Sequence, residues 1–427
     1  MERTLYDTIC DINKKTRARF CMPGHSGMGT TERIFTCAKY DWTEVYGLDN
    51  LLQSQDVIMK SENAIAKSMG YASALMLTQG STCGMHIAVN VCKDNGKTLV
   101  AIGDMHKSFY AACRLYGAEA VIAASVEDLR QIDFSEKKVG GVFVTSPDYF
   151  GKCRELSFLR ELADKLGAYF VVDEAHASHF AYSSLLPNNA HSFADISLMS
   201  MHKTMPVYGL GALVCLKDES LRLECERYRA MIHSSSPNYL VMASMDYANS
   251  YMSENGEYDY ARAKKYVDDF SRNLAIGQVV KTDDFSRLVI KIDGKDACDA
   301  SIELAKRGVF VEMAKDDLLV CIVTPFNCVR LNTLAQELKN IKYKDLCDSR
   351  NEISKTVKVT DNSQDEIECV DIENCAGRIC AEDVGVYPPG VPVAIKGEVI
   401  SKDMALYLKK YRNRLFGLAQ GRIAVIK

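Results

Sequence analysis

The chain has 427 residues, 47% of them hydrophobic and 25% charged, with a formal net charge of −4. Such a composition is ordinary for a soluble globular protein, and the length suggests roughly two or three domains. The chain lacks the basic excess of nucleic-acid-binding proteins, and no apolar run approaches the ~20 residues of a membrane helix. Because the first residues also lack the apolar core of a signal peptide, we expect a cytoplasmic protein with no nucleic-acid or membrane partner.

Sixteen cysteines invite a disulfide or metal interpretation. No two of them form a Cys-x-x-Cys pair, however, and Cys215 and Cys321 stand inside apolar runs. These features are typical of reduced cysteines that pack as small hydrophobic residues, so we predict no metal site. All eight histidines fall between His25 and His233, which suggests that the polar chemistry lies in the first part of the chain.

The first 35 residues are predicted to form an N-terminal segment. It holds a candidate first helix and then an irregular loop at 22–29, where three glycines and a proline fall close together. A second loop is expected at 41–51, around the only tryptophan, and a helix at 61–69.

From residue 74 onward, apolar strands alternate with helices. Strands are expected at 75–78, 98–103, 121–124, 141–145, 168–173, 196–199 and 212–216, with a turn at 79–84 and helices at 85–92, 105–116 and 156–166. Unbroken apolar strands separated by helices indicate an α/β large domain over 36–274, with a mainly parallel central sheet covered by helices on both faces. In such sheets ligands bind beyond the carboxyl ends of the strands.

The pattern changes from about residue 275. Strands are expected at 286–292, 309–311, 318–323 and 422–426, helices at 298–307, 329–338 and 402–413, and an exposed acidic connection at 360–374. The segment Tyr387-Pro388-Pro389-Gly390-Val391-Pro392 must be extended, because it is too rich in proline for a helix. These features predict a smaller α+β C-terminal domain over 275–427.

The strand at 196–199 runs directly into Ser200, His202 and Lys203. Ammonium is costly in a packed core, and burial lowers the pKa of a lysine toward the neutral amine that Schiff-base chemistry requires. The alternative is a lysine that has reached the surface after its strand ends, which is the ordinary interpretation of Lys203 taken alone.

Three other strand ends carry polar residues of matching chemistry. Gly80-Ser81-Thr82 opens a helix and suits a phosphate, although a simple N-cap is the alternative. His106 would lie flat over an aromatic cofactor or be a structural histidine. Asp173 follows four apolar residues and needs a cationic partner such as a protonated pyridine nitrogen, although an aspartate there often caps a helix or binds a metal. Together with Lys203, these signals match what pyridoxal 5'-phosphate needs.

The sequence resembles the Orn/Lys/Arg decarboxylases, which are pyridoxal-phosphate enzymes of the aspartate-aminotransferase fold (fold type I). The resemblance covers most of the chain and rests on blocks in family order, namely Pro23-Gly24-His25, Thr43-Glu44, Gly47-Leu48-Asp49-Asn50-Leu51, Gly80-Ser81-Thr82, His106-Lys107-Ser108, Thr145-Ser146-Pro147, Asp173-Glu174-Ala175-His176, His202-Lys203-Thr204, Ser236-Pro237-Asn238-Tyr239 and Tyr387-Pro388-Pro389-Gly390-Val391-Pro392.

The resemblance implies a role for each residue of the site. Lys203 would form the Schiff base, His106 would stack on the cofactor ring and be available for proton transfer, and Asp173 would bind the pyridine nitrogen. Further cofactor contacts are expected from Gly80, Ser81, Thr82, Ala175, His176, Ser200 and His202. The family's assembly implies a homodimer, or a multiple of dimers, with sites at the subunit interface.

Several positions depart from the family pattern. Gln53-Ser54-Gln55 stands where a His-x-Pro is usual, Gln79 replaces an asparagine, and Tyr208-Gly209-Leu210 replaces a Thr-Gln pair. Ser26 and Lys396 also differ from the usual lysine and proline. In the family these loops approach the substrate or the neighbouring subunit, so the departures bear on substrate identity more than on the cofactor.

We therefore predict α-decarboxylation of arginine, lysine or ornithine to the amine and CO2, as in polyamine biosynthesis. The distal cation of such a substrate needs a carboxylate, for which Glu312 is a candidate, while Asp316 and Asp317 are better explained as solvated charges. Two alternatives stay open. One is another reaction of the same cofactor, a carbon–carbon lyase or an aminotransferase, which would need a carboxylate-binding arginine such as Arg378. The other is a non-catalytic, ligand-binding or regulatory member.

Overall fold

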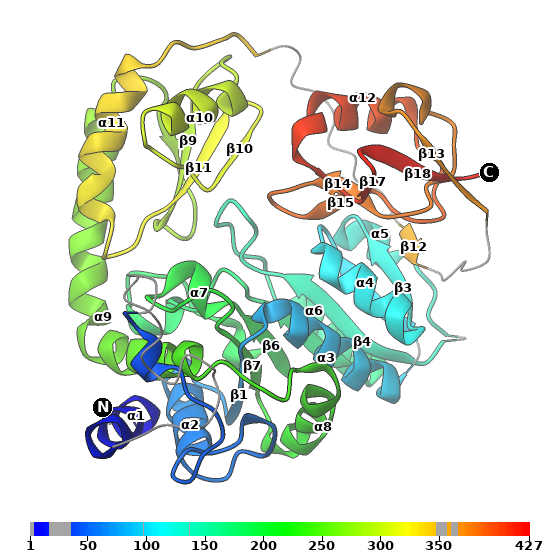
Figure 1. Ribbon diagram of the computed structural model, residues 1–427. Helices are drawn as coiled ribbons and strands as arrows, with labels where there is room; N and C mark the ends of the chain where they lie inside the picture. The colour runs from blue at the N-terminus through cyan, green and yellow to red at the C-terminus, as the bar shows by residue number, and fades with distance from the viewer. Residues whose placement is uncertain (1–3, 17–35, 97, 136, 347–356, 360–365) are drawn as a thin grey trace.

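The structure is a computed structural model that describes residues 4–16, 36–96, 98–135, 137–346, 357–359 and 366–427 (Figure 1). The loop at 22–29, with Pro23-Gly24-His25 and Ser26, lies outside these residues. Helix α1 (Thr4–Lys15) packs against α2 (Val57–Met69) and α9 (Tyr239–Asn273). The domain boundaries at 35 and 274 stay predictions.

The large domain is built on an eight-stranded sheet. Its spatial order is β1 (Ser73–Leu77), β7 (Ala212–Leu216), β6 (Ile196–Met199), β5 (Tyr169–Asp173), β4 (Val139–Thr145), β2 (Thr98–Ile102), β3 (Glu119–Ala123) and β12 (Val357–Val359). Strands β6, β5, β4, β2 and β3 are parallel neighbours, whereas β7 and the edge strand β12 pair antiparallel to theirs. The expectation of a mainly parallel sheet is confirmed.

Helices cover both faces of this sheet because successive strand residues point to opposite sides. Val171 packs with the helices α3 (Gly80–Asn95), α4 (Lys107–Tyr116) and α8 (Arg222–Ile232), while the adjacent Val172 packs with α5 (Val126–Arg130) and α6 (Ser157–Leu166). Around β1 and β7 the second face is covered by α2 and by the 35-residue helix α9. None of the described helices has both the length and the apolar character needed to span a membrane.

The second half of the chain forms three small antiparallel sheets. The first has the order β10 (Met313–Lys315), β11 (Leu318–Ile322), β9 (Arg287–Lys291) and β8 (Gln278–Val280), with helices α10 (Ala297–Lys306) and α11 (Leu331–Asn340). Figure 1 shows α9 running from the large domain up beside α11, so that this helix joins the two parts.

The other two small sheets lie near the C-terminus (Figure 1, orange and red). They are β13 (Ile367–Val370) with β18 (Arg422–Ile426) and β17 (Leu418–Ala419), and β15 (Val391–Ala394) with β14 (Val384–Val386) and β16 (Leu415–Phe416), with helix α12 (Lys402–Lys410). The expected small α+β C-terminal region is thus antiparallel throughout its described residues.

Several local predictions were wrong. The exposed connection expected at 360–374 contains β13, and residues 387–390 of the segment expected to be extended form a turn, closed by a hydrogen bond of 3.0 Å from the Gly390 N–H to the Val386 carbonyl. The turn expected at 79–84 is instead the start of helix α3, which begins at Gly80. Gly80 has a φ of +73°, a conformation that glycine adopts without strain, so the chain passes from β1 into the helix without a longer turn. The strand expected at 309–311 is absent, and β10 begins at Met313 instead. The turn at Asp316 and Asp317 pairs Lys315 with Leu318, which sets that register and leaves Phe310 81% exposed.

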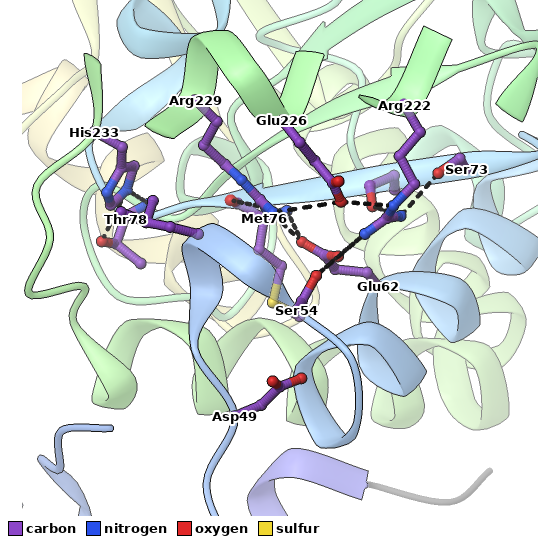
Figure 2. A network of polar contacts seen from close by, with 12 residues as sticks. Asp49, Ser54, Glu62, Ser73, Met76, Thr78, Arg222, Glu226, Arg229 and His233 are labelled. Carbon is purple, nitrogen blue, oxygen red and sulfur yellow. Dashed lines mark hydrogen bonds and ion pairs between the residues drawn. The ribbon is translucent and has the colours of Figure 1, made fainter. Parts of the chain in front are cut away.

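A buried polar network fixes α2 and α8 to β1 (Figure 2). The Glu62 carboxylate is fully buried and lies between Arg222 and Arg229, accepting a hydrogen bond of 2.7 Å from Arg229 Nη1. It also accepts from the Met76 backbone N–H at 2.9 Å. Further along the same strand, the Thr78 N–H donates to His233 Nε2 at 3.0 Å. These contacts therefore hold the carboxyl end of β1 in place, two residues before Gly80.

Candidate active site

A cavity of about 660 Å³ lies at the carboxyl ends of the large sheet, lined on its other sides by β10, by residues 386–389 and 391–393, and by Tyr407 and Tyr411, which lie in α12 and directly after it. This is the place where α/β sheets bind ligands. The cavity wall contains all ten residues expected from the sequence to bind the cofactor: Gly80, Ser81, Thr82, His106, Asp173, Ala175, His176, Ser200, His202 and Lys203.

One end of the cavity is rich in hydrogen-bond donors. The 16-residue helix α3 begins there, so its first free N–H groups and the positive end of its dipole face the cavity with the Ser81 and Thr82 hydroxyls. Ser200 Oγ donates to Ser81 Oγ at 2.7 Å, which joins the ends of β6 and β1. His202 Nδ1 donates to the Gly211 carbonyl at 2.9 Å, so the Nε2 of the neutral ring is an acceptor and is not one of these donors. Such a donor set suits a phosphate.

Lys203 extends into the cavity from the short helix α7 (Met201–Thr204), which directly follows β6. Its Nζ lies 3.2 Å from His176 Nε2. Burial lowers the pKa of Lys203, and the nearby Asp173 opposes that shift only in part. The lysine is thus held toward the neutral, nucleophilic amine.

Asp173 is the last residue of β5 and is 7% exposed. Its Oδ1 accepts a hydrogen bond of 3.1 Å from the Ala175 N–H. Burial raises the pKa of this carboxyl, and the Lys203 ammonium only partly offsets the effect. A further cation beside Asp173 would therefore be stabilised strongly by its ionised form.

His106 is the N-cap of α4, and its Nδ1 accepts a hydrogen bond of 3.2 Å from the Ser108 N–H. Burial, with smaller contributions from Lys203 and Lys107, lowers the pKa of His106 to about 4. The ring is therefore neutral near pH 7. The C-terminal region comes close to this ring, since a Cβ added to Gly390 would lie 3.0 Å from His106 Nε2. The Gly390 carbonyl also accepts from the Lys107 N–H at 2.8 Å.

The sequence analysis missed Arg287, the first residue of β9. It is 1% exposed, and its Nη2 donates to His176 Nδ1 at 2.6 Å. On another side of the imidazole, the Tyr149 ring contacts it edge-on with centroids 4.6 Å apart. Arg287 could have been identified in the same way as Lys203. A cationic residue at the start of an apolar strand is as unusual as one that follows directly after such a strand.

The candidate substrate carboxylates lie outside the cavity wall. Glu312 is not among the lining residues, although residues 313–315 are, and it accepts a hydrogen bond of 3.3 Å from Tyr149 OH. Asp316 accepts from Lys410 Nζ at 2.7 Å and from Tyr411 OH at 3.1 Å. It therefore connects the small sheet to the C-terminal region. The substrate role of Glu312 stays a prediction.

Arg378 does not lie at the cavity. It pairs with Glu368 and donates to the Ile426 carbonyl at 3.1 Å, inside the C-terminal sheets. The structure therefore does not place this arginine where an aminotransferase would need one to hold a carboxylate.

Two family models match the sequence. The model of the Orn/Lys/Arg decarboxylase major domain matches residues 3–280, and that of the Orn/Lys/Arg decarboxylase C-terminal domain matches residues 341–416.

Individual proteins are more distantly similar. The chain is 26% identical to the uncharacterized protein YaaO of Bacillus subtilis, covering 96% of this chain and 94% of that protein. It is 23% identical to an arginine decarboxylase of Bacillus anthracis, covering 96% and 93%. Among solved structures, the lysine decarboxylase of Francisella novicida superposes with a TM-score of 0.79 at 16% identity, covering 100% of this chain and 81% of that one. That likeness shows the fold.

Proposed function

Because the chain belongs to the Orn/Lys/Arg decarboxylase family, we propose that it converts a basic L-amino acid, namely arginine, lysine or ornithine, into the corresponding amine and CO2 with pyridoxal 5'-phosphate as cofactor. The observation that carries the proposal is the juxtaposition in one cavity of a lysine held toward its neutral form, the buried Asp173 and the phosphate-type donors of α3. Arginine decarboxylases among the relatives support the choice of substrate class.

The residues of the cavity fit the cofactor group by group. The start of α3, with Ser81, Thr82 and Ser200, would hold the phosphate. Asp173 would bind the pyridine nitrogen as an ion pair, because a cation there offsets the cost of its burial. His106 is neutral and would cover the ring without adding a second positive charge. Lys203 is the nucleophile for the aldehyde carbon.

The reaction consumes one proton for each CO2 that is released. The bond between Cα and the carboxylate breaks, CO2 leaves, and the electron pair that stays on Cα takes up a proton to give the amine. The cofactor supplies an electron-accepting ring when bound. The chain supplies orientation through the cavity wall, and the protonated form of Lys203 or of His106 would return the proton to Cα.

We further propose that the active form is a homodimer or a multiple of dimers. Leu210 lines the cavity yet is 56% exposed, and Tyr208 beside it is 49% exposed. Apolar residues so exposed at a cavity mouth are typical of a surface that another chain covers. Light scattering of the purified protein would test this, and a monomer with full activity would contradict it.

The test of function is CO2 release from a panel of amino acids by protein loaded with pyridoxal 5'-phosphate. We expect release from at least one of arginine, lysine and ornithine, and a loss of roughly 10⁴-fold or more in Lys203→Ala. Lys217→Ala, at an exposed lysine, is the matched control. A loaded protein that forms keto acids without releasing CO2 would instead favour an aminotransferase.

A further inference from the structure

A fully buried arginine reaches the candidate active site from the small antiparallel sheet. Arg287 Nη2 lies 2.6 Å from His176 Nδ1, and His176 Nε2 lies 3.2 Å from Lys203 Nζ. These contacts form a chain of three groups that begins in β9 and ends at the reactive amine. Arg287 itself does not line the cavity, so it does not meet a ligand there.

The proton positions along this chain follow from the chemistry of its first member. A guanidinium is always protonated in proteins and has no acceptor, so it must donate to His176 Nδ1. A neutral imidazole that accepts at Nδ1 carries its proton on Nε2. The Nε2–H can then only donate to Lys203, which must accept with the lone pair of a neutral amine.

The surroundings reinforce the neutral state of the imidazole. His176 is 3% exposed, and burial, followed by the charges of Lys203 and Arg287, lowers its pKa well below the usual range. The other charged or titratable groups that face His176 and Lys203 are Asp173, His106, His179, Glu312 and Tyr149. In a doubly protonated ring the Nδ1–H would point at the N–H groups of the Arg287 guanidinium. Two donors cannot share a hydrogen bond, so the ring carries no proton on Nδ1.

The backbone is also built around this arginine. Gly151 has a φ of +82°, and a Cβ there would lie 2.6 Å from Arg287 Cβ. Arg287 makes no ion pair with any residue that the structure describes, and its Nη1 is buried without a hydrogen-bond partner among them. Burial lowers the pKa of Arg287, and the carboxylates of Asp284 and Glu312 oppose that shift without forming an ion pair with the guanidinium. A buried guanidinium whose one side-chain hydrogen bond among the described residues goes to a neutral imidazole suggests a purpose beyond folding.

We infer that Arg287 is a positioning residue that fixes His176 as a hydrogen-bond donor toward the Lys203 nitrogen and thereby keeps that nitrogen deprotonated. The inference rests on the proposed function for the role of Lys203 as the cofactor's attachment point. It also makes the small antiparallel sheet part of the active site, because β9 carries Arg287.

The first experiment measures the pH midpoint of the visible absorbance change of protein loaded with pyridoxal 5'-phosphate. Arg287→Met removes the cation that lies on the far side of His176 from the reactive nitrogen, so the midpoint should rise by about 1 pH unit, while Arg287→Lys should shift it less. Arg160→Met is the control. That partly buried arginine binds Asp195 at 2.7 Å, just before the amino end of β6, and should leave the midpoint unchanged. An unchanged midpoint in a loaded Arg287→Met protein would overturn the inference.

The second experiment needs neither cofactor nor an Arg287 variant. Nitrogen-15 NMR of the histidine-labelled wild-type protein, with the His176 signals identified by their loss in His176→Gln, reports the tautomer directly. We expect the proton on Nε2, and a proton on Nδ1 would overturn the inference. If the wild-type protein shows no visible band after loading, the proposed function fails, and this spectrum still decides the role of Arg287.

Discussion

Within the described residues, arginines are completely buried in two regions, and the guanidinium groups have different kinds of partner in the two. Arg229, in the network of Figure 2, is 0% exposed and pairs with Glu62 at 2.7 Å, while its neighbour Arg222 pairs with Glu62 and Glu226. Two carboxylates thus balance two guanidinium groups. Arg287 is 1% exposed and contacts a neutral imidazole in place of a carboxylate.

The difference separates a structural use of buried charge from a functional one. In the Glu62 network, opposite charges and backbone groups compensate each other, so the network positions α2, α8 and β1 without influencing a reactive group. Around Lys203, burial is the main cause that lowers the pKa of the lysine, Arg287 lowers it further, and the carboxylates of Asp173 and Glu312 oppose the shift only in part. Uncompensated buried charge is typical of sites that must bind or react.

The largest expected effect is in the structural network. Glu62→Gln leaves Arg222 and Arg229 buried without their shared carboxylate, and we expect the free energy of unfolding to fall by about 3–5 kcal/mol. Urea unfolding followed by circular dichroism measures this. Asp164→Asn, which removes an exposed partner of Arg160, should cost less than about 1 kcal/mol. If Glu62→Gln cost no more than that control, the charges of the network would not be structural.

A second prediction concerns Glu174, a carboxyl buried with hydrogen bonds but no cation. It accepts from the Ala190 N–H at 2.8 Å and from Tyr71 OH at 3.0 Å, and burial raises its pKa to about 7. Its folded-state pKa thus lies above the ordinary value. The buried carboxyl stabilises the folded protein in its neutral form. This contribution is complete below about pH 4.5, the ordinary pKa, and is lost as the pH rises through about 7 and the group ionises. The loss amounts to about 3 kcal/mol.

Glu174→Gln keeps the size and one acceptor oxygen but cannot ionise, and its amide NH2 would donate to Tyr71 OH where the carboxylate accepts from it. The difference in unfolding free energy of the cofactor-free protein between about pH 5 and about pH 8 should shrink by up to about 3 kcal/mol in this variant. Parallel pH curves for the variant and the wild-type protein would show that Glu174 titrates normally, and that hydrogen bonds alone can keep a buried carboxylate ionised here.

The smallest effect tests how the C-terminal region meets the site. Gly390 and Gly377 have similar φ angles of +85° and +82°, but only a Cβ at Gly390 would touch the His106 ring. Alanine at either position should cost about 1 kcal/mol of stability from backbone strain. Gly390→Ala should also weaken binding of pyridoxal 5'-phosphate roughly tenfold, which is about 1.4 kcal/mol. Equal affinities in the two variants would mean that His106 does not depend on this contact.

The large domain could be predicted well because its signals are local. Each buried parallel strand is an unbroken apolar run, and the polar residues at its carboxyl end follow within a few positions, as Asp173 and Lys203 do. The strand ends pointed to eight residues that line one cavity, and the family resemblance added Ala175 and His176; the eight are Gly80, Ser81, Thr82, His106, Asp173, Ser200, His202 and Lys203.

The rest could not be predicted because it depends on contacts between distant segments. Helix α9 is buried against the large domain at one end and against α11 at the other, so its apolar residues form no single stripe, and its pattern did not predict a helix. Arg287 meets His176 across 111 positions of sequence, and no local pattern records that pairing.

The most direct test of the account is to identify the residue that carries the cofactor. The protein loaded with pyridoxal 5'-phosphate is reduced with borohydride, digested and analysed by mass spectrometry. We predict a pyridoxyl group on Lys203 and on no other lysine, since burial keeps this amine toward its neutral form beside the phosphate donors of α3. A label on a different lysine, or no label at all, would contradict the account.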